Sequence, residues 1–160
     1  RAEFILAGYN GNPGSVSIWD KMKTVFNQTG AARVLPSLGL DNYMEHYSQA
    51  DVSLIPLVNN EFNNCKSILK VLEAAAKKLP CIISAVYPYL ELKHVPGIKW
   101  VEKPQDWIDH IKYYLKNLNK IISDGEDLYN YMRMFYNLEH WNKVRYNALK
   151  SLVKDPIKTT

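Results

Sequence analysis

Residues 50–89, which read ADVSLIPLVNNEFNNCKSILKVLEAAAKKLPCIISAVYPY, decide the fold of this chain. Two short apolar runs, Val52 to Ile55 and Cys81 to Ile83, are typical of parallel strands that are covered on both faces. Between them we expect one helix from Cys65 to Lys78, which ends before a proline. The stretch therefore predicts a strand, a polar loop, a helix and a second buried strand.

The expected helix has two different faces, and Asn63 or Asn64 can cap its start. At about 100° per residue, one narrow stripe is charged and the opposite side is apolar. The charged stripe holds Lys66, Lys70, Glu73 and Lys77, and the apolar side holds Leu69, Leu72, Ala76 and Leu79. A helix N-terminus that carries a lysine and follows a strand and a polar loop is a typical phosphate-binding site.

The rest of the chain alternates strands and helices. Further strands are expected at 3–8, 32–35 and 98–101, and helices at 15–30, 41–50 and 105–118. This alternation predicts an α/β fold, a Rossmann-like doubly wound parallel sheet over residues 1–118. Residues 119–160 are expected to form a C-terminal helical extension, with helices at 120–136 and 139–153 that pack on the sheet or on a partner domain.

The bulk composition excludes several classes of protein. The chain has 160 residues, 47% of them hydrophobic, and a net charge of +4 without a run of five like charges, which argues against a nucleic-acid-binding tail. No apolar stretch approaches the roughly 20 residues of a transmembrane helix, and no signal peptide is recognised. We interpret Cys65 and Cys81 as reduced cysteines with a structural role. The four histidines are scattered, so no metal site is predicted.

For two features, the residues alone do not decide between a ligand-binding role and a structural role. The loop from Gly8 to Gly14, which includes Asn10, is either a plain tight turn or a backbone surface near a diphosphate; it matches neither GxGxxG nor a Walker motif. Lys66 could neutralise a diphosphate while Glu73 accepts hydrogen bonds from two sugar hydroxyls. Alternatively, both lie on a solvated helix face, where Glu73 and Lys77 form a pair worth about 0.3 kcal/mol.

The central block resembles a known family through the segments YSQADVSLIPL, FNNCKS, LKVLEAAAKKLPCIIS and VYPY. It is similar to the donor-binding C-terminal domain of GT-B-fold glycosyltransferases of the "glycosyl transferases group 1" kind, over roughly residues 4–118. The resemblance implies that Glu73 binds the donor ribose. It also implies that Lys66, Ser67 and the backbone around Asn63 and Asn64 face the diphosphate; Gly8 and Asn10 join this set as the possible loop contacts.

The chain departs from the family pattern at two positions. Cys65 stands where the commoner form has an acidic residue, and Lys78 stands where a glycine precedes the Leu-Pro step. We also expect residues 1–160 to lack the first strand and helix of the domain, together with the N-terminal acceptor-binding domain.

The resemblance implies transfer of a sugar from a nucleoside-diphosphate sugar to a glycan or lipid-linked acceptor, as in polysaccharide synthesis. It implies no metal and no cofactor. The charge distribution predicts no nucleic-acid partner, and the reduced cysteines predict a cytoplasmic location, which includes the inner face of the membrane. The resemblance assigns no catalytic residue. The alternatives are a non-catalytic α/β module, either receiver-like or a degenerate transferase domain. The sequence argues against a receiver domain, which needs aspartates at its strand ends, because the strand ends here are Gly8, Leu35 and Leu57.

Overall fold

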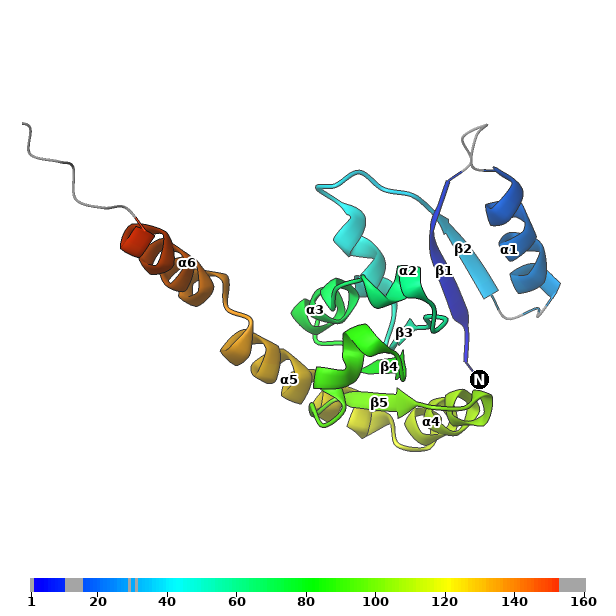
Figure 1. Cartoon of the computed structure of the whole chain (residues 1–160). Coiled ribbons are helices and arrows are strands. Elements are labelled where there is room, and N and C mark those ends of the chain that lie inside the picture. The colour runs from blue at the N-terminus through cyan, green and yellow to red at the C-terminus, as the bar shows by residue number, and fades with distance from the viewer. Residues whose placement is uncertain (1, 11–15, 29, 31, 153–160) are drawn as a thin grey trace, which may run out of the picture.

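A computed structural model describes residues 2–10, 16–28, 30 and 32–152 of the chain (Figure 1). Strands and helices alternate through most of it, and three consecutive helices follow the last strand. In chain order the elements are β1 (Phe4–Tyr9), α1 (Val16–Gln28), β2 (Ala32–Pro36), the 3-10 helix η1 (Tyr43–Gln49), β3 (Ser53–Ile55), α2 (Glu61–Asn64), α3 (Leu69–Ala76), β4 (Cys81–Ser84), the 3-10 helix η2 (Tyr87–Leu92), β5 (Ile98–Val101), α4 (Pro104–Lys116), α5 (Leu118–Phe135) and α6 (Leu138–Leu152).

The predicted α/β class is confirmed: all strand pairings are parallel, and helices flank the sheets. The strands form two sheets rather than one uninterrupted ladder. One sheet has the order β1-β2 and the other the order β3-β4-β5. In the second sheet β4 is central, with Ser53 opposite Cys81 on one side and Cys81 opposite Ile98 on the other.

The main core surrounds β4. Cys81, Ile82 and Ile83 have no exposed surface, as expected of a parallel strand that is covered on both faces. One side is covered mainly by α3, η2 and α5, and the other mainly by α4. No described residue of β1, β2 or η1 is buried, so the buried core lies between Ile55 and Met132.

The chain reverses at the end of α3 through a left-handed residue, Lys78, whose φ is 57°. Its N–H donates to the Ala75 carbonyl at 2.8 Å, and the Leu79 N–H donates to the Ala74 carbonyl at 3.0 Å. These two bonds form a Schellman motif, in which glycine usually takes the left-handed position. In the family that the sequence resembles, this position holds a glycine. The structure shows why: the backbone here is left-handed, which glycine adopts most easily, although this chain has a lysine.

Several expected boundaries and faces are corrected by the structure. Residues 43–49 form a 3-10 helix rather than an α-helix from Asp41 to Ala50. On α4 the deeply buried residue is Tyr114, whereas the apolar Ile108 and Leu115 are 47% and 44% exposed. Every residue of α6 is exposed, so this helix does not pack on the sheet; Figure 1 shows it beyond the far end of α5.

Candidate functional site

The loop after β3 is fixed by hydrogen bonds at the carboxyl ends of β3 and β4. The Leu57 N–H donates to Ser84 Oγ at 2.9 Å, which ties the start of the loop to the end of β4. Asn60 caps α2, because its Oδ1 accepts from the Asn63 N–H at 2.8 Å. Asn63 in turn donates from Nδ2 to the Val58 carbonyl at 2.8 Å. The conformation of the polar loop is thus defined by its own hydrogen bonds.

The single helix that we expected from Cys65 to Lys78 is shortened to α3, Leu69–Ala76, and a separate short helix, α2, lies before it in the expected polar loop. The N-cap of α3 is Ile68, which makes no side-chain cap bond, rather than Asn63 or Asn64. Just before α3, Ser67 Oγ accepts from the Leu69 N–H at 3.4 Å. Such a local bond between a serine side chain and the backbone competes with helix hydrogen bonding and suits a residue that lies outside the helix.

Of the predicted ligand-binding residues of this segment, Asn63 and Asn64 lie in α2, and Lys66 and Ser67 lie between α2 and α3. Lys66 and Ser67 are both exposed, and Lys66 Nζ lies 5.1 Å from the centre of the Phe62 ring. Asn63 is half-buried and held by the loop bonds. Asn64 has a buried Oδ1 that accepts no hydrogen bond from the described residues.

Glu73 is the most distinctive polar residue of the fold, because its side chain is only 7% exposed. Its Oε2 accepts from Tyr47 Oη at 2.6 Å and from Lys70 Nζ at 3.0 Å. Its Oε1 accepts from Tyr43 Oη at 3.2 Å. Glu73 therefore joins α3 to η1 through the two phenol hydroxyls, while Lys70 contacts it from within α3 itself.

These contacts keep the Glu73 carboxyl ionised. Burial by itself would raise its pKa, but hydrogen bonds from Tyr47, Lys70 and Tyr43, together with the charge of Lys70, bring the pKa below its ordinary value. In turn, burial and the bond to Glu73 raise the pKa of the Tyr43 and Tyr47 phenols. The cluster thus holds one negative charge opposite three donors.

The face on which we placed Glu73 needs correction. We expected it on an open charged stripe, with Leu69 on the buried side. In the structure Glu73 is buried, while Leu69 is 53% exposed. The structure brings Glu73 into contact with Lys70 rather than Lys66. The sequence analysis missed Tyr43 and Tyr47 as polar partners of Glu73, and their i,i+4 spacing is the only signal that could have pointed to a shared contact.

Gly8 and Asn10 lie at the carboxyl end of β1, in the other sheet. Gly8 has a φ of 91° and lies at an irregularity in the register between Ala7 and Tyr9. A glycine in such a bulge is explained by its backbone conformation alone. The loop glycines at positions 11 and 14 lie outside the described residues.

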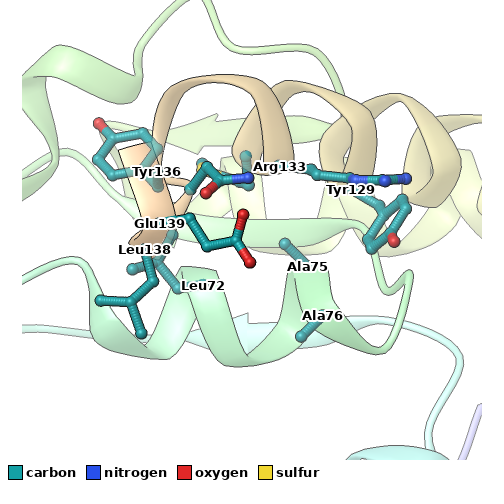
Figure 2. A pocket seen from close by; sticks show the side chains of 10 residues that line it. Leu72, Ala75, Ala76, Tyr129, Arg133, Tyr136, Leu138 and Glu139 are labelled. Carbon is teal, nitrogen blue, oxygen red and sulfur yellow. The ribbon is translucent and has the colours of Figure 1, made fainter. Parts of the chain in front are cut away.

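A groove of about 410 Å³ lies on another side of α3, between α3, α5 and the start of α6 (Figure 2). On α3 it is lined by Leu72, Ala75 and Ala76, and not by Glu73. Figure 2 shows that Arg133 and Glu139 contribute polar side chains from α5 and α6. The groove is therefore separate from the Glu73 cluster.

The described ranges contain neither a metal-ligating cluster nor a membrane-spanning helix. No group of three or more His, Cys, Asp or Glu residues there could hold a metal ion. No helix there is both long enough and apolar enough to span a bilayer.

Comparison with known proteins found no family model that matches the chain and no curated protein that matches it.

Proposed function

We propose that this chain is the donor-binding domain of a GT-B-fold glycosyltransferase, which moves a sugar from a nucleoside-diphosphate sugar to a glycan or lipid-linked acceptor. The observation that carries the proposal is Glu73, an ionised carboxylate already surrounded by hydroxyl donors. It lies on the helix that the sequence resemblance assigns to the donor ribose. The two free cysteines, Cys65 and Cys81, suit the reducing cytoplasm in which we place the protein.

Glu73 has the chemistry needed to bind a ribose. An ionised carboxylate offers about four acceptor positions, and Tyr47, Lys70 and Tyr43 occupy three of them. A sugar hydroxyl is the same type of donor as a phenol hydroxyl. Because the bond from Tyr43 is the longest of the three, we expect one ribose hydroxyl to replace Tyr43 on Oε1 and the other to use the remaining position.

The diphosphate would lie between Lys66, Ser67 and the first turn of α3. The backbone N–H groups of a first helical turn lack carbonyl partners within the helix and favour a negative charge. Lys66 is exposed, and its ammonium group lies over the Phe62 ring. The ammonium group is therefore available to a ligand. Catalysis in such a site consists of positioning the donor and stabilising the charge of the leaving diphosphate.

Nucleotide titration followed by amide NMR tests the proposal. Adding UDP, GDP or ADP to the isotope-labelled chain should shift the amide signals of residues 60–75, and Glu73→Gln should weaken that binding at least about tenfold. Glu126→Gln is the matched control, since Glu126 is an exposed carboxylate in an ion pair with Lys78. If no nucleotide shifts these signals, or if both variants bind equally well, the donor-site assignment is wrong.

A second candidate, a non-catalytic α/β module, is favoured by the burial of Glu73. A carboxylate that is 7% exposed and has three partners is also what a purely structural tie between η1 and α3 would require. For such a module, Glu73→Gln would lower the stability of the chain, and no nucleotide would bind to the unaltered protein.

A further inference from the structure

The last helix, α6, separates apolar from polar side chains along its whole length. At about 100° per residue, its apolar side chains fall within one arc of roughly 140°. This apolar arc holds Leu138, Trp141, Val144, Ala148, Leu149 and Leu152. The opposite side of the helix holds only polar side chains: Glu139, His140, Lys143, Asn147, Lys150 and Ser151. α6 is therefore amphipathic, with a broad polar face.

The apolar arc is not buried against any part of the chain that the structure describes. All residues of α6 are exposed, and Leu149 and Leu152 are 65% and 78% exposed. The Trp141 indole N–H donates to the Phe135 carbonyl at 2.8 Å. Phe135, at the end of α5, is itself 50% exposed, so the exposed apolar surface continues from α5 onto α6. Because a helix of 15 residues is marginal in water unless its apolar face is packed, this arc needs a cover.

The distribution of charge favours an anionic cover. Residues 138–160 have five basic and two acidic side chains, which gives this segment a net charge of +3. Residues 1–137 have 15 basic and 14 acidic side chains, which leaves only +1 of the total of +4. Most of the net positive charge of the chain therefore belongs to α6 and the residues that follow it.

Arg145 indicates what kind of surface covers the arc. By the same angular spacing it lies inside the apolar arc, and its Nη1 donates at 3.0 Å to Asn142 Oδ1 on the same helix. In an apolar protein interface this guanidinium group would be buried at a cost, unless the partner placed a carboxylate opposite it. At a bilayer surface the long side chain can extend past its apolar neighbours to the lipid phosphates, which a guanidinium group binds well.

A second copy of the chain fits this face poorly. Arg145 is the middle residue of α6, which spans Leu138–Leu152. If two copies of the helix packed antiparallel along their full length about a two-fold axis, each Arg145 would lie opposite the other. Two like charges would then meet inside an apolar contact.

We propose that α6 lies in the plane of an anionic phospholipid bilayer, with its apolar arc turned to the acyl chains and Arg145 at the lipid phosphates. A helix with tryptophan and leucine on one face and lysines on a broad polar face is the type that binds at this interface. Its 15 residues are about 22 Å long, which is shorter than the roughly 30 Å hydrocarbon core, so it lies on the bilayer and does not cross it.

Flotation of the 160-residue chain with vesicles tests the proposal, and it uses no nucleotide, so it can fail independently of the sugar-donor assignment. The vesicles contain phosphatidylglycerol and phosphatidylcholine in about equal amounts. Leu149→Glu should weaken binding at least about tenfold. Leu118→Glu is the matched control, since Leu118 on α5 is 64% exposed and Leu149 is 65% exposed; it should bind like the unaltered chain.

A second pair of variants tests the contribution of charge. Arg145→Gln should weaken binding by about fivefold. Lys116→Gln removes the same charge from an exposed position on α4 and should have a smaller effect. Amide hydrogen exchange of the vesicle-bound chain should show new protection in α6.

Four results would each overturn the proposal. The first is no binding to these vesicles, which would leave the apolar arc to another protein. The second is equal binding by Leu149→Glu and Leu118→Glu, and the third is equally strong binding to vesicles of phosphatidylcholine alone. The last is a chain that is already dimeric without vesicles, with α6 protected from exchange, which would show that a second copy covers the helix.

Discussion

Replacing Tyr47 by phenylalanine tests the Glu73 cluster most directly. The substitution removes one oxygen and keeps the ring, so packing around η1 is preserved. The bond that is lost, from Tyr47 Oη to Glu73 Oε2, is 2.6 Å long and is the shortest in the cluster. Its acceptor is ionised and only 7% exposed, which are the conditions under which a hydrogen bond contributes most to stability.

The expected loss follows from these properties. Hydrogen bonds to charged groups contribute about 1.5–3 kcal/mol. Lys70 remains 3.0 Å from the same carboxylate oxygen, so Glu73 is not left without a partner, and the loss should fall near the lower limit. We expect Tyr47→Phe to lower the free energy of unfolding by about 2 kcal/mol, which lowers Tm by roughly 4–8 °C in a domain of this size. Tyr43→Phe should cost less, because its bond is 3.2 Å long.

Urea unfolding at neutral pH, followed by far-ultraviolet circular dichroism and tryptophan fluorescence, measures these differences. Tyr87→Phe is the matched control, since Tyr87 is 68% exposed, and it should change the free energy by less than about 0.5 kcal/mol. The m-values should be equal among the variants. If Tyr47→Phe is no less stable than Tyr87→Phe, Glu73 does not hold η1 against α3, and our account of its ionisation is wrong.

Three further predictions concern pH and the turn after α3. The pKa of Glu73 is lower in the folded chain than its ordinary value of about 4.5, so as the pH falls the unfolded chain binds a proton first. The free energy of unfolding should therefore decrease as the pH falls through and below 4.5. The decrease should be less steep in Glu73→Gln. Gly125→Ala should cost about 3 kcal/mol or more, because a Cβ there would lie 2.0 Å from the Lys78 carbonyl oxygen. Gly39→Ala, which has open space, is its control, and urea unfolding compares the two. Lys78→Gly should have a higher Tm than Lys78→Ala, since both lose the ion pair with Glu126 but only glycine relieves the left-handed φ of 57°; equal Tm values would show that the backbone there is unstrained.

Two strands of the three-stranded sheet were predicted closely from the sequence. The apolar run from Cys81 to Ile83 lies within β4, and the strand expected at 98–101 has the bounds of β5. For β4 composition alone is a sufficient signal, because a parallel strand that is covered on both faces excludes polar residues. β5 contains Lys99 and only its Val101 is buried, so the turn residue Gly97 just before it is the clearer signal there.

The start of α3 was not predictable from periodicity. The pattern from Cys65 to Lys78 supports one helix over its whole length, but α3 begins only at Leu69. In the structure α3 turns Glu73 inward and Leu69 outward. We assigned the carboxylate to the solvent because its half-buried partners, Tyr43 and Tyr47, are 30 and 26 residues away in the sequence.

The structural and ligand-binding roles of Glu73 require the same chemistry, and they differ only in which donor occupies Oε1. Tyr47 and Lys70 share Oε2 and together fix the carboxylate. Among the residues that the structure describes, Tyr43 alone donates to Oε1, and it comes from η1, in which no residue is buried. Removing Tyr43 from Oε1 therefore disturbs no part of the core. A ligand hydroxyl can replace this one contact while the other two keep Glu73 ionised and in place, so burial of the carboxylate in the free protein is compatible with its use as a sugar ligand.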